Sequence, residues 1–301
     1  MRKHALIWGT ALLLVQLSLI TPLLAITFWF AAIPAVVLYV KTNRAWFAGA
    51  AGVSLAVGAT LSGSFALGFL WIALTTLVPA IALGEAYRRR HSARKSVTAG
   101  IIAYLAMFLL SVLIATGLGV NLTTAIGEMI RDGLAAFPEP MRAALTEETL
   151  HEFILWTVRM IPFYFIATSA LMAALTHTLS RRLANRRGPA LVPSMPPIRD
   201  WKLPRAFVWY YLIALFVDLL VPADDTSFLT TAIVNIVPLF MFVFAVQGIS
   251  FLFFIGYAKR KMWIPWVGVA AVVLVNPLFS AFSLLGVFDT AFPIRDRFRK
   301  T

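Results

Sequence analysis

Polar side chains lie inside several apolar stretches of this sequence, and they are its best candidates for ligand binding. Arg159, Asp218 and Asn235 lie at nearly the same depth from the ends of three stretches, and Gln247 and Asn276 lie deeper. A charged Arg inside a membrane costs roughly 2.5 to 3.5 kcal/mol at the centre and less near the edge, so it should find a counter-charge or water. We therefore predict that these five residues form a ligand site in which Arg159 pairs with Asp218. A structural ion pair that only holds the helices together is the alternative interpretation.

The sequence offers no pattern typical of an enzyme or a metal site. It contains no cysteine, and neither a nucleotide-binding loop nor the motifs HExxH and GxSxG occur in it. The four histidines are isolated from one another: His4, His91, His151 and His177. Glu85 and the acids of the outer loops could act as an acid or a base, but Glu85 stands beside Arg88 to Arg90, which would neutralise it. We predict a protein that is not an enzyme and uses no cofactor or metal.

The apolar stretches themselves predict an all-α membrane protein. Hydrophobic residues make up 60% of the 301, charged residues make up 13%, and the mean hydropathy is +0.85. This is more apolar material than one soluble core of that length can bury. A helix needs about 20 apolar residues to cross the hydrocarbon core, so we predict a polytopic bundle of about eight to nine spans, with early breaks near Pro22 and Gly63.

The spans group into three predicted parts. Residues 1–180 hold six spans, residues 181–205 form a basic, proline-containing cytoplasmic loop, and residues 206–301 form a C-terminal unit of two to three spans. Between the fifth span and the sixth, which we expect to begin at Phe153, apolar residues recur at helical spacing among polar ones. This pattern indicates an amphipathic helix on the outer surface.

Clusters of basic residues alternate with pairs of spans and predict the orientation. Of 26 Lys and Arg residues, 19 lie in five such clusters, whereas eight of the 13 acidic residues lie in two of the intervening loops. Basic loops remain on the cytoplasmic side of a membrane. We therefore predict a bacterial inner-membrane protein with a cytoplasmic N-terminus. The net charge of +13 then faces the headgroups of membrane lipids and does not indicate nucleic-acid binding.

The last apolar segment, residues 263–288, has two possible topologies. At 26 residues it is too short for two full spans. We expect it to cross the membrane once, which would leave the basic tail outside. The alternative is a re-entrant segment that turns around Asn276 and Pro277 and keeps the tail inside.

Small residues in the first predicted span provide a candidate docking surface. Ala5 and Gly9 are four residues apart, and a similar spacing recurs from Ala45 to Ala56. Such spacing lets helix backbones approach each other closely. Ordinary packing within the bundle is the alternative to a surface for a partner protein.

Several segments resemble the YybS-like family of uncharacterised bacterial multi-span membrane proteins. They read FWFAAIPAVVLYVKTNRAWFAGAAGVSLAVGATL (28–61), LGEAYRRRHSARKSVTAG (83–100), IVNIVPLFMFVFAVQGISFLFFIGYAKRK (233–261) and NPLFSAFSLLGVFDTAFPIRDR near the end. The six N-terminal spans of that family are distantly similar to the substrate-binding components of energy-coupling-factor transporters. This resemblance implies an outward-facing pocket and a coupling partner in the membrane that works with separate ATPases. Ala5 and Gly9 would then dock that partner.

Two functions of different classes follow from these observations. The first is a non-enzymatic membrane protein that binds a small molecule or lipid in an outward-opening cavity, as a transport subunit that depends on a partner ATPase. The second is a membrane scaffold or regulator that recruits a cytoplasmic protein or anionic lipid through its basic loops. A deep polar cavity among the six N-terminal spans would favour the first.

Overall fold

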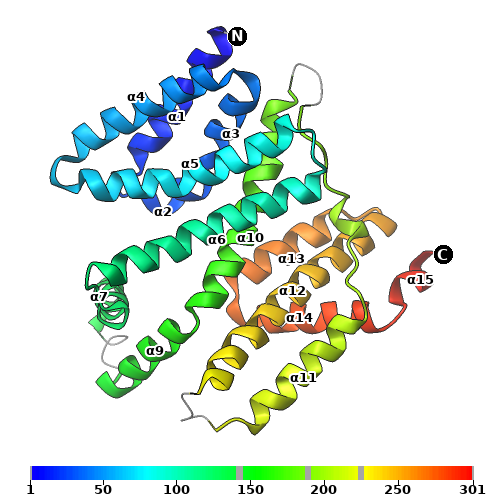
Figure 1. The fold of residues 1–301 in the computed structure, drawn as a ribbon. Helices are drawn as coiled ribbons and strands as arrows, with labels where there is room; N and C mark the ends of the chain where they lie inside the picture. The colour runs from blue at the N-terminus through cyan, green and yellow to red at the C-terminus, as the bar shows by residue number, and fades with distance from the viewer. Residues whose placement is uncertain (1, 140–144, 187–190, 223–226, 300–301) are drawn as a thin grey trace. The chain divides into compact units, whose positions relative to one another are not determined.

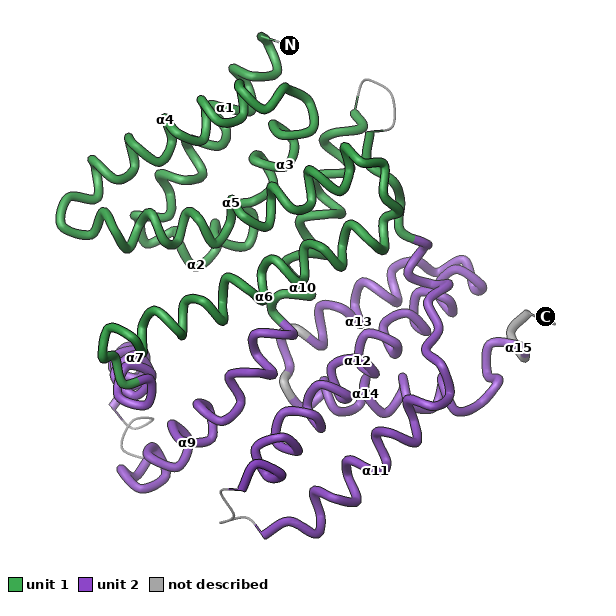
Figure 2. The backbone as a smooth tube through the Cα atoms, viewed as in Figure 1, with its two compact units in different colours: residues 1–121, 168–195 green, residues 122–167, 196–301 purple. Residues whose placement is uncertain are grey.

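The computed structural model describes residues 2–139, 145–186, 191–222 and 227–299, and the regular structure of these residues is entirely helical (Figure 1). The predicted all-α class is therefore confirmed. The chain divides into two compact units (Figure 2): residues 1–121 with 168–195, and residues 122–167 with 196–301. This division places 122–167 with the C-terminal helices, unlike the three parts expected from the sequence.

Unit 1 is built from helices that begin and end at residues suited to those positions. Their bounds are α1 Arg2–Ser18, α2 Leu24–Thr27, η1 Phe28–Phe30, α3 Ala32–Lys41, α4 Arg44–Ser62, η2 Gly63–Phe65, α5 Ala66–Arg88, α6 Ala93–Gly117 and the greater part of α10, Ile161–Ala184. Asn43 caps α4 by accepting from the Trp46 amide, and Ser92 caps α6 by accepting from that of Lys95. Gly63 adopts a φ of 55°, and the chain turns there between α4 and α5, close to the predicted break.

The core of unit 1 surrounds α3, which packs against α1 and α5. Residues 32–39 of α3 are all buried, including Val36 and Leu38 with no exposed surface. A helix that is apolar on every side fits only where other helices surround it. Leu83 of α5, Tyr104 of α6 and Met172 of α10 complete the buried cluster.

Unit 2 contains the outer predicted helix and the C-terminal helices. Their bounds are α7 Leu122–Ala135, α9 Glu147–Arg159, η3 Ile198–Asp200, α11 Ala206–Leu220, α12 Phe228–Ala258, α13 Trp263–Leu274, α14 Asn276–Ala291 and α15 Ile294–Arg299, together with the first turns of α10. The predicted amphipathic segment forms α7, which packs against α9. The sixth span begins at Ile161 and not at the expected Phe153, because the helix breaks at Met160, just before Pro162.

Five helical segments of the described chain are long and apolar enough to cross a membrane. They are Leu24–Lys41, Arg44–Arg88, Ala93–Gly117, Ile161–Ala184 and Phe228–Ala258. The second of them runs through 45 residues and comprises both α4 and α5. Large apolar side chains on α11 are exposed, among them Trp209 at 67% and Leu219 at 82%, as expected for a helix that faces lipid.

The close crossing of α12 and α14 is the main contact within unit 2. It depends on two glycines, one on each helix. A Cβ atom at Gly286 would collide with the carbonyl oxygen of Phe244, and one at Gly248 would collide with that of Phe282. The two backbones can therefore approach this closely only with glycine at both positions.

The last apolar segment is not one continuous helix. α13 ends at Leu274, Val275 is extended, with φ −123° and ψ 94°, and α14 begins at Asn276. Pro277 has no amide hydrogen to continue the preceding helix but suits the first turn of a new one. The segment therefore consists of two short helices, and its single crossing of the membrane stays a prediction.

Candidate functional site

A buried ion pair lies at the centre of the polar residues of unit 2. Asp289, near the end of α14, has no exposed side-chain surface, and the side chain of Arg295 is 8% exposed. Arg295 Nη2 lies 2.6 Å from Asp289 Oδ2, and its Nε donates to Oδ1 at 2.8 Å. Two hydrogen bonds in parallel make this the strong, oriented form of a carboxylate–guanidinium contact.

The same ion pair binds a segment of the basic loop. Arg295 Nη1 donates to the backbone carbonyl of Arg199 at 2.6 Å, and Arg295 Nη2 donates to Ser250 Oγ at 3.1 Å. Ser250 Oγ in turn lies 2.6 Å from the carbonyl oxygen of Ile198. Gln247 Nε2 donates to both Asp289 and the carbonyl of Trp201. Side chains from α12 and the start of α15 thus hold residues 198–201 through backbone carbonyls, and Asp289 of α14 binds two of these side chains.

Aromatic rings on α12 lie against the guanidinium groups of the two arginines. The Arg199 guanidinium lies 3.7 Å from the centre of the Tyr257 ring, and that of Arg295 lies 5.3 Å from the Phe254 ring. A cation over an aromatic face is attracted by the negative face of the ring. These contacts restrict the orientation of both guanidinium groups.

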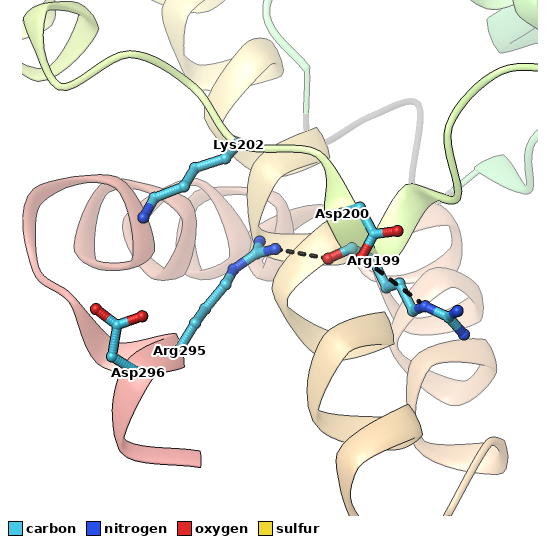
Figure 3. Close-up of a pocket in the computed structure, with 5 residues that line it drawn as sticks. All are labelled: Arg199, Asp200, Lys202, Arg295 and Asp296. Atoms are coloured by element: carbon cyan, nitrogen blue, oxygen red, sulfur yellow. Dashed lines mark hydrogen bonds and ion pairs between the residues drawn. The ribbon is translucent and has the colours of Figure 1, made fainter. Parts of the chain in front are cut away.

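A hollow of about 270 Å³ opens beside this ion pair (Figure 3). Its lining comprises Arg199, Asp200, Lys202, Arg295 and Asp296. Lys202 and Asp296 lie on one side of Arg295, whereas the Arg199 side chain points away from it (Figure 3). With the adjacent Asp289 counted, the residues around the hollow include three cationic side chains and three carboxylates. The hollow therefore has no excess charge that would favour an anion.

Two of the five predicted site residues meet at the break between α9 and α10. Asn235 Nδ2 donates to the carbonyl of Arg159 at 2.9 Å, and Asn235 Oδ1 accepts from the amide of Phe163 at 2.8 Å. A helix break leaves such backbone groups without partners in the helix. The Asn235 side chain bonds two of these backbone groups, so it has a structural role at this break.

The predicted pairing of Arg159 with Asp218 is wrong. No ion pair joins these side chains in the described chain, and Asp218 is exposed on α11. Gln247 does enter a buried polar cluster, but with Asp289 and the loop as partners. Asn276 begins α14, and its side chain lies outside the described part of the structure.

Three members of the buried cluster were missed from the sequence: Ser250, Asp289 and Arg295. The sequence does contain a signal, because Asp289 directly follows an apolar stretch and precedes an arginine by six residues. Ending the last span at Phe288 placed Asp289 in a loop and Arg295 among ordinary tail charges. An acidic residue within the last turn of an apolar helix should instead have been paired with a nearby base.

Unit 1 contains a different kind of polar feature. All the buried side-chain nitrogen and oxygen atoms that lack a hydrogen-bond partner within the described chain belong to this unit. They are Gln16 Oε1, Ser54 Oγ, Ser169 Oγ, His177 Nε2, Ser180 Oγ and Arg181 Nε. Gln16 and His177 each use their other polar atom, since Gln16 Nε2 donates to Thr76 Oγ1 at 3.2 Å and His177 Nδ1 lies 2.7 Å from Tyr87 Oη.

Ala5 and Gly9 contribute to the packing of α1 within unit 1. Ala5 is 6% exposed, and a Cβ atom at Gly9 would lie 3.4 Å from that of Ala50 on α4. The contact is an ordinary one between packed helices. Gly9 therefore takes part in the contact of α1 with α4, and Ala5 is buried within the unit.

Glu85 is neutralised as its sequence position indicated. Its carboxylate accepts from Tyr39 Oη at 2.8 Å, from Arg44 at 3.1 Å and from Arg89 at 3.0 Å. Arg88 donates instead to the backbone carbonyls of Tyr39 and Thr42. These contacts join the ends of α3, α4 and α5.

The helical fold and the long apolar helices define a multi-pass membrane protein. The chain matches the family described as Predicted membrane protein (DUF2232) over residues 10–290, and it belongs to this family. It is 26% identical over 238 residues to the uncharacterized protein YybS of Bacillus subtilis (strain 168), a match that covers 76% of each chain. The YybS-like resemblance read from the sequence is thus confirmed. No solved structure matches the chain significantly.

Proposed function

We propose that the protein binds a small molecule or lipid through the helices of unit 1. The observation that supports this function is the set of buried polar atoms without partners on α1, α4 and α10. Gln16, Ser54, Ser169 and Ser180 have no exposed surface, and His177 is 2% exposed.

The energetic argument is that such atoms are costly unless something binds them. A buried polar group without a hydrogen bond costs about 1 to 3 kcal/mol, and buried groups in native proteins are nearly always partnered by protein or ordered water. Several orphan atoms in one unit, with none among the described residues of the other, favour a bound polar molecule or waters that accompany it. Its chemistry would include both donors and acceptors, to match an amide oxygen, hydroxyls and an imidazole nitrogen.

A role as a transport subunit extends this proposal. It rests on the distant resemblance of the N-terminal spans to substrate-binding components of energy-coupling-factor transporters, with an outward-opening cavity. The sequence has no nucleotide-binding loop, so a partner with ATPase activity would have to supply the energy. In this proposal the protein itself is not an enzyme.

We expect a molecule to remain bound when the protein is purified in mild detergent. Replacing Gln16 by Leu, or His177 by Phe, removes one orphan atom together with its partnered neighbour. Each loss of a hydrogen bond should weaken retention about tenfold, since roughly 1.4 kcal/mol corresponds to a factor of ten. Mass spectrometry of the extracted protein measures the retained amount.

Thr60→Val is the matched control for these variants. Its hydroxyl is exposed on α4 and donates only to the Ala56 carbonyl of its own helix, so retention should not change. Equal retention in all three variants, or the recovery of nothing except bulk membrane lipid, would rule out a polar ligand in unit 1.

The cellular orientation of the protein completes the proposal. We infer a bacterial inner-membrane protein with its N-terminus in the cytoplasm, on the basis of the basic clusters. Reporter domains fused after Lys95 and within residues 186–199 should therefore be cytoplasmic, and one fused near Glu139 should be outside. Activity of a cytoplasm-specific reporter at Glu139 would reverse this orientation.

A scaffold or regulator that recruits anionic lipid or a cytoplasmic protein is the second candidate. It is favoured by one observation, that residues 198–201 are held in place by Arg295 and Gln247 while Lys202 beside them is exposed. The same mass-spectrometric experiment separates the two candidates. Retention of anionic lipid that depends on Arg199 and Lys202, but not on Gln16 or His177, would favour the scaffold.

A further inference from the structure

We infer that α13 and α14 form a re-entrant hairpin, which returns the C-terminal tail to the membrane face where the basic loop lies. There Arg295 binds the backbone of that loop at Arg199, a contact that we call the clasp. This inference concerns unit 2 alone and does not depend on the proposed ligand of unit 1. It joins three observations: the lengths of the two helices, the way they fold on each other, and the contacts of the tail.

Neither helix is long enough to cross the membrane alone. α13 has 12 residues and α14 has 16, which correspond to about 18 Å and about 24 Å at 1.5 Å per residue. The hydrocarbon core is about 30 Å thick. Two such helices can form one broken span if they continue in the same direction, or a hairpin if they fold back.

The contacts show that they fold back. A Cβ atom at Gly268 of α13 would lie 3.2 Å from the Phe282 ring of α14. Residues 268 and 282 are 14 positions apart, which would separate them by about 21 Å along a straight helix. Phe282 also meets α12, because its carbonyl faces Gly248. α13 and α14 therefore pack together against the same helix.

The backbone at the tip of the hairpin is suited to a turn inside the membrane. A turn at this depth is tolerated only where its polar groups find partners within the protein. The Val275 amide donates to the Ala271 carbonyl at 2.9 Å, and the Leu278 amide donates to the Val275 carbonyl at 2.9 Å. Pro277 has no amide hydrogen to satisfy.

The tail then meets the basic loop. The Arg295 guanidinium donates to the Arg199 carbonyl, and its counter-ion Asp289 accepts from Gln247, which also donates to the Trp201 carbonyl. Because the Arg295 side chain touches the backbone of the loop, the start of the tail and residues 198–201 must lie at the same face of the membrane. The basic residues Arg297 and Arg299 of the tail then obey the same charge rule as the loop.

The clasp has a mechanical consequence for the loop. Residues 198–201 are held by side chains of Gln247, Ser250 and Arg295 that bind their carbonyl oxygens. Arg295 of the tail thus contributes to the contact that holds this part of the loop against the helices. Loss of Arg295 should release the loop without altering the lengths of the helices.

Single-cysteine labelling tests the hairpin, because the chain contains no cysteine of its own. Asp296→Cys, Lys202→Cys and Glu148→Cys each place one thiol at an exposed position. A membrane-impermeant maleimide is applied to sealed vesicles of each orientation. We expect Asp296→Cys and Lys202→Cys to react from one side and Glu148→Cys from the other. Reaction of Asp296→Cys from the side of Glu148→Cys would overturn the re-entrant topology.

The clasp is tested by the labelling rate at Lys202→Cys in a second set of variants. Adding Arg295→Met should raise that rate several-fold, whereas adding Asp296→Asn, an exposed neighbour, should not. If Arg295→Met fails to fold, the double replacement Asp289→Leu with Arg295→Leu removes the clasp without a buried unpaired charge. An unchanged rate in a folded clasp variant would show that Arg295 does not hold the loop.

Discussion

Replacing Asp289 alone by Leu is expected to destabilise the protein by roughly 3 to 5 kcal/mol, because Arg295 would keep its charge in a buried place without a partner. The Asp289 side chain is fully buried and that of Arg295 is 8% exposed, so little water can replace the lost carboxylate. Arg295→Met should cost less. A carboxyl group left alone can take up a proton, whereas a guanidinium stays charged.

The double replacement of both residues by Leu should recover most of the stability, since no charge then remains in the buried site. Thermal or denaturant unfolding in detergent, followed by tryptophan fluorescence, gives the comparison. Asp296→Asn serves as the control because its side chain is exposed. If the double variant were as unstable as Asp289→Leu, the hydrogen bonds to the loop, and not the compensation of charge, would account for the stability.

Gly286→Ala is expected to have the second large effect, a loss of about 1 to 3 kcal/mol, as is usual for overpacking a close contact. The new methyl group would collide with the backbone carbonyl of Phe244, and a backbone atom cannot move aside as the end of a side chain can. Separation of α12 from α14 would also displace Gln247 from Asp289. The loop contact should therefore weaken together with the stability, which unfolding and labelling at Lys202→Cys measure in parallel.

Gly52→Ala is the control for this prediction. Gly52 lies within α4, and a Cβ atom there would meet nothing within 4 Å. Alanine is a better helix former than glycine by about 1 kcal/mol, so this variant should be neutral or more stable. A loss of stability equal to that of Gly286→Ala would mean that the α12–α14 crossing is not the reason that glycine is needed at residue 286.

The sequence by itself determined the class of the protein and most of its helices. Helix length and hydropathy are local properties, so the all-α class and the helices around the Gly63 turn follow from residue types alone. Glu85 was also predictable, because its neutralising partner Arg89 is one helical turn away.

The partners of buried polar residues were decided only by the tertiary structure. The sequence indicated that Gln247 lies inside a span, but the partner of Gln247 depends on which face of α14 meets α12. That contact is set by two glycines 38 residues apart, Gly248 and Gly286. Asp218 shows the opposite outcome, since equal depth in two helices does not bring their side chains to the same face.

The path of the last apolar segment was likewise determined by tertiary contacts. Its 26 residues are compatible with one crossing or with a short hairpin, and hydropathy has the same value for both. The packing of Phe282 against positions 268 and 248 shows that α13 and α14 fold back on each other, which supports the hairpin that we infer. The buried charge pair adds the reason for the direction of the tail, because Arg295 and Asp289 are stable in an apolar unit only when they meet.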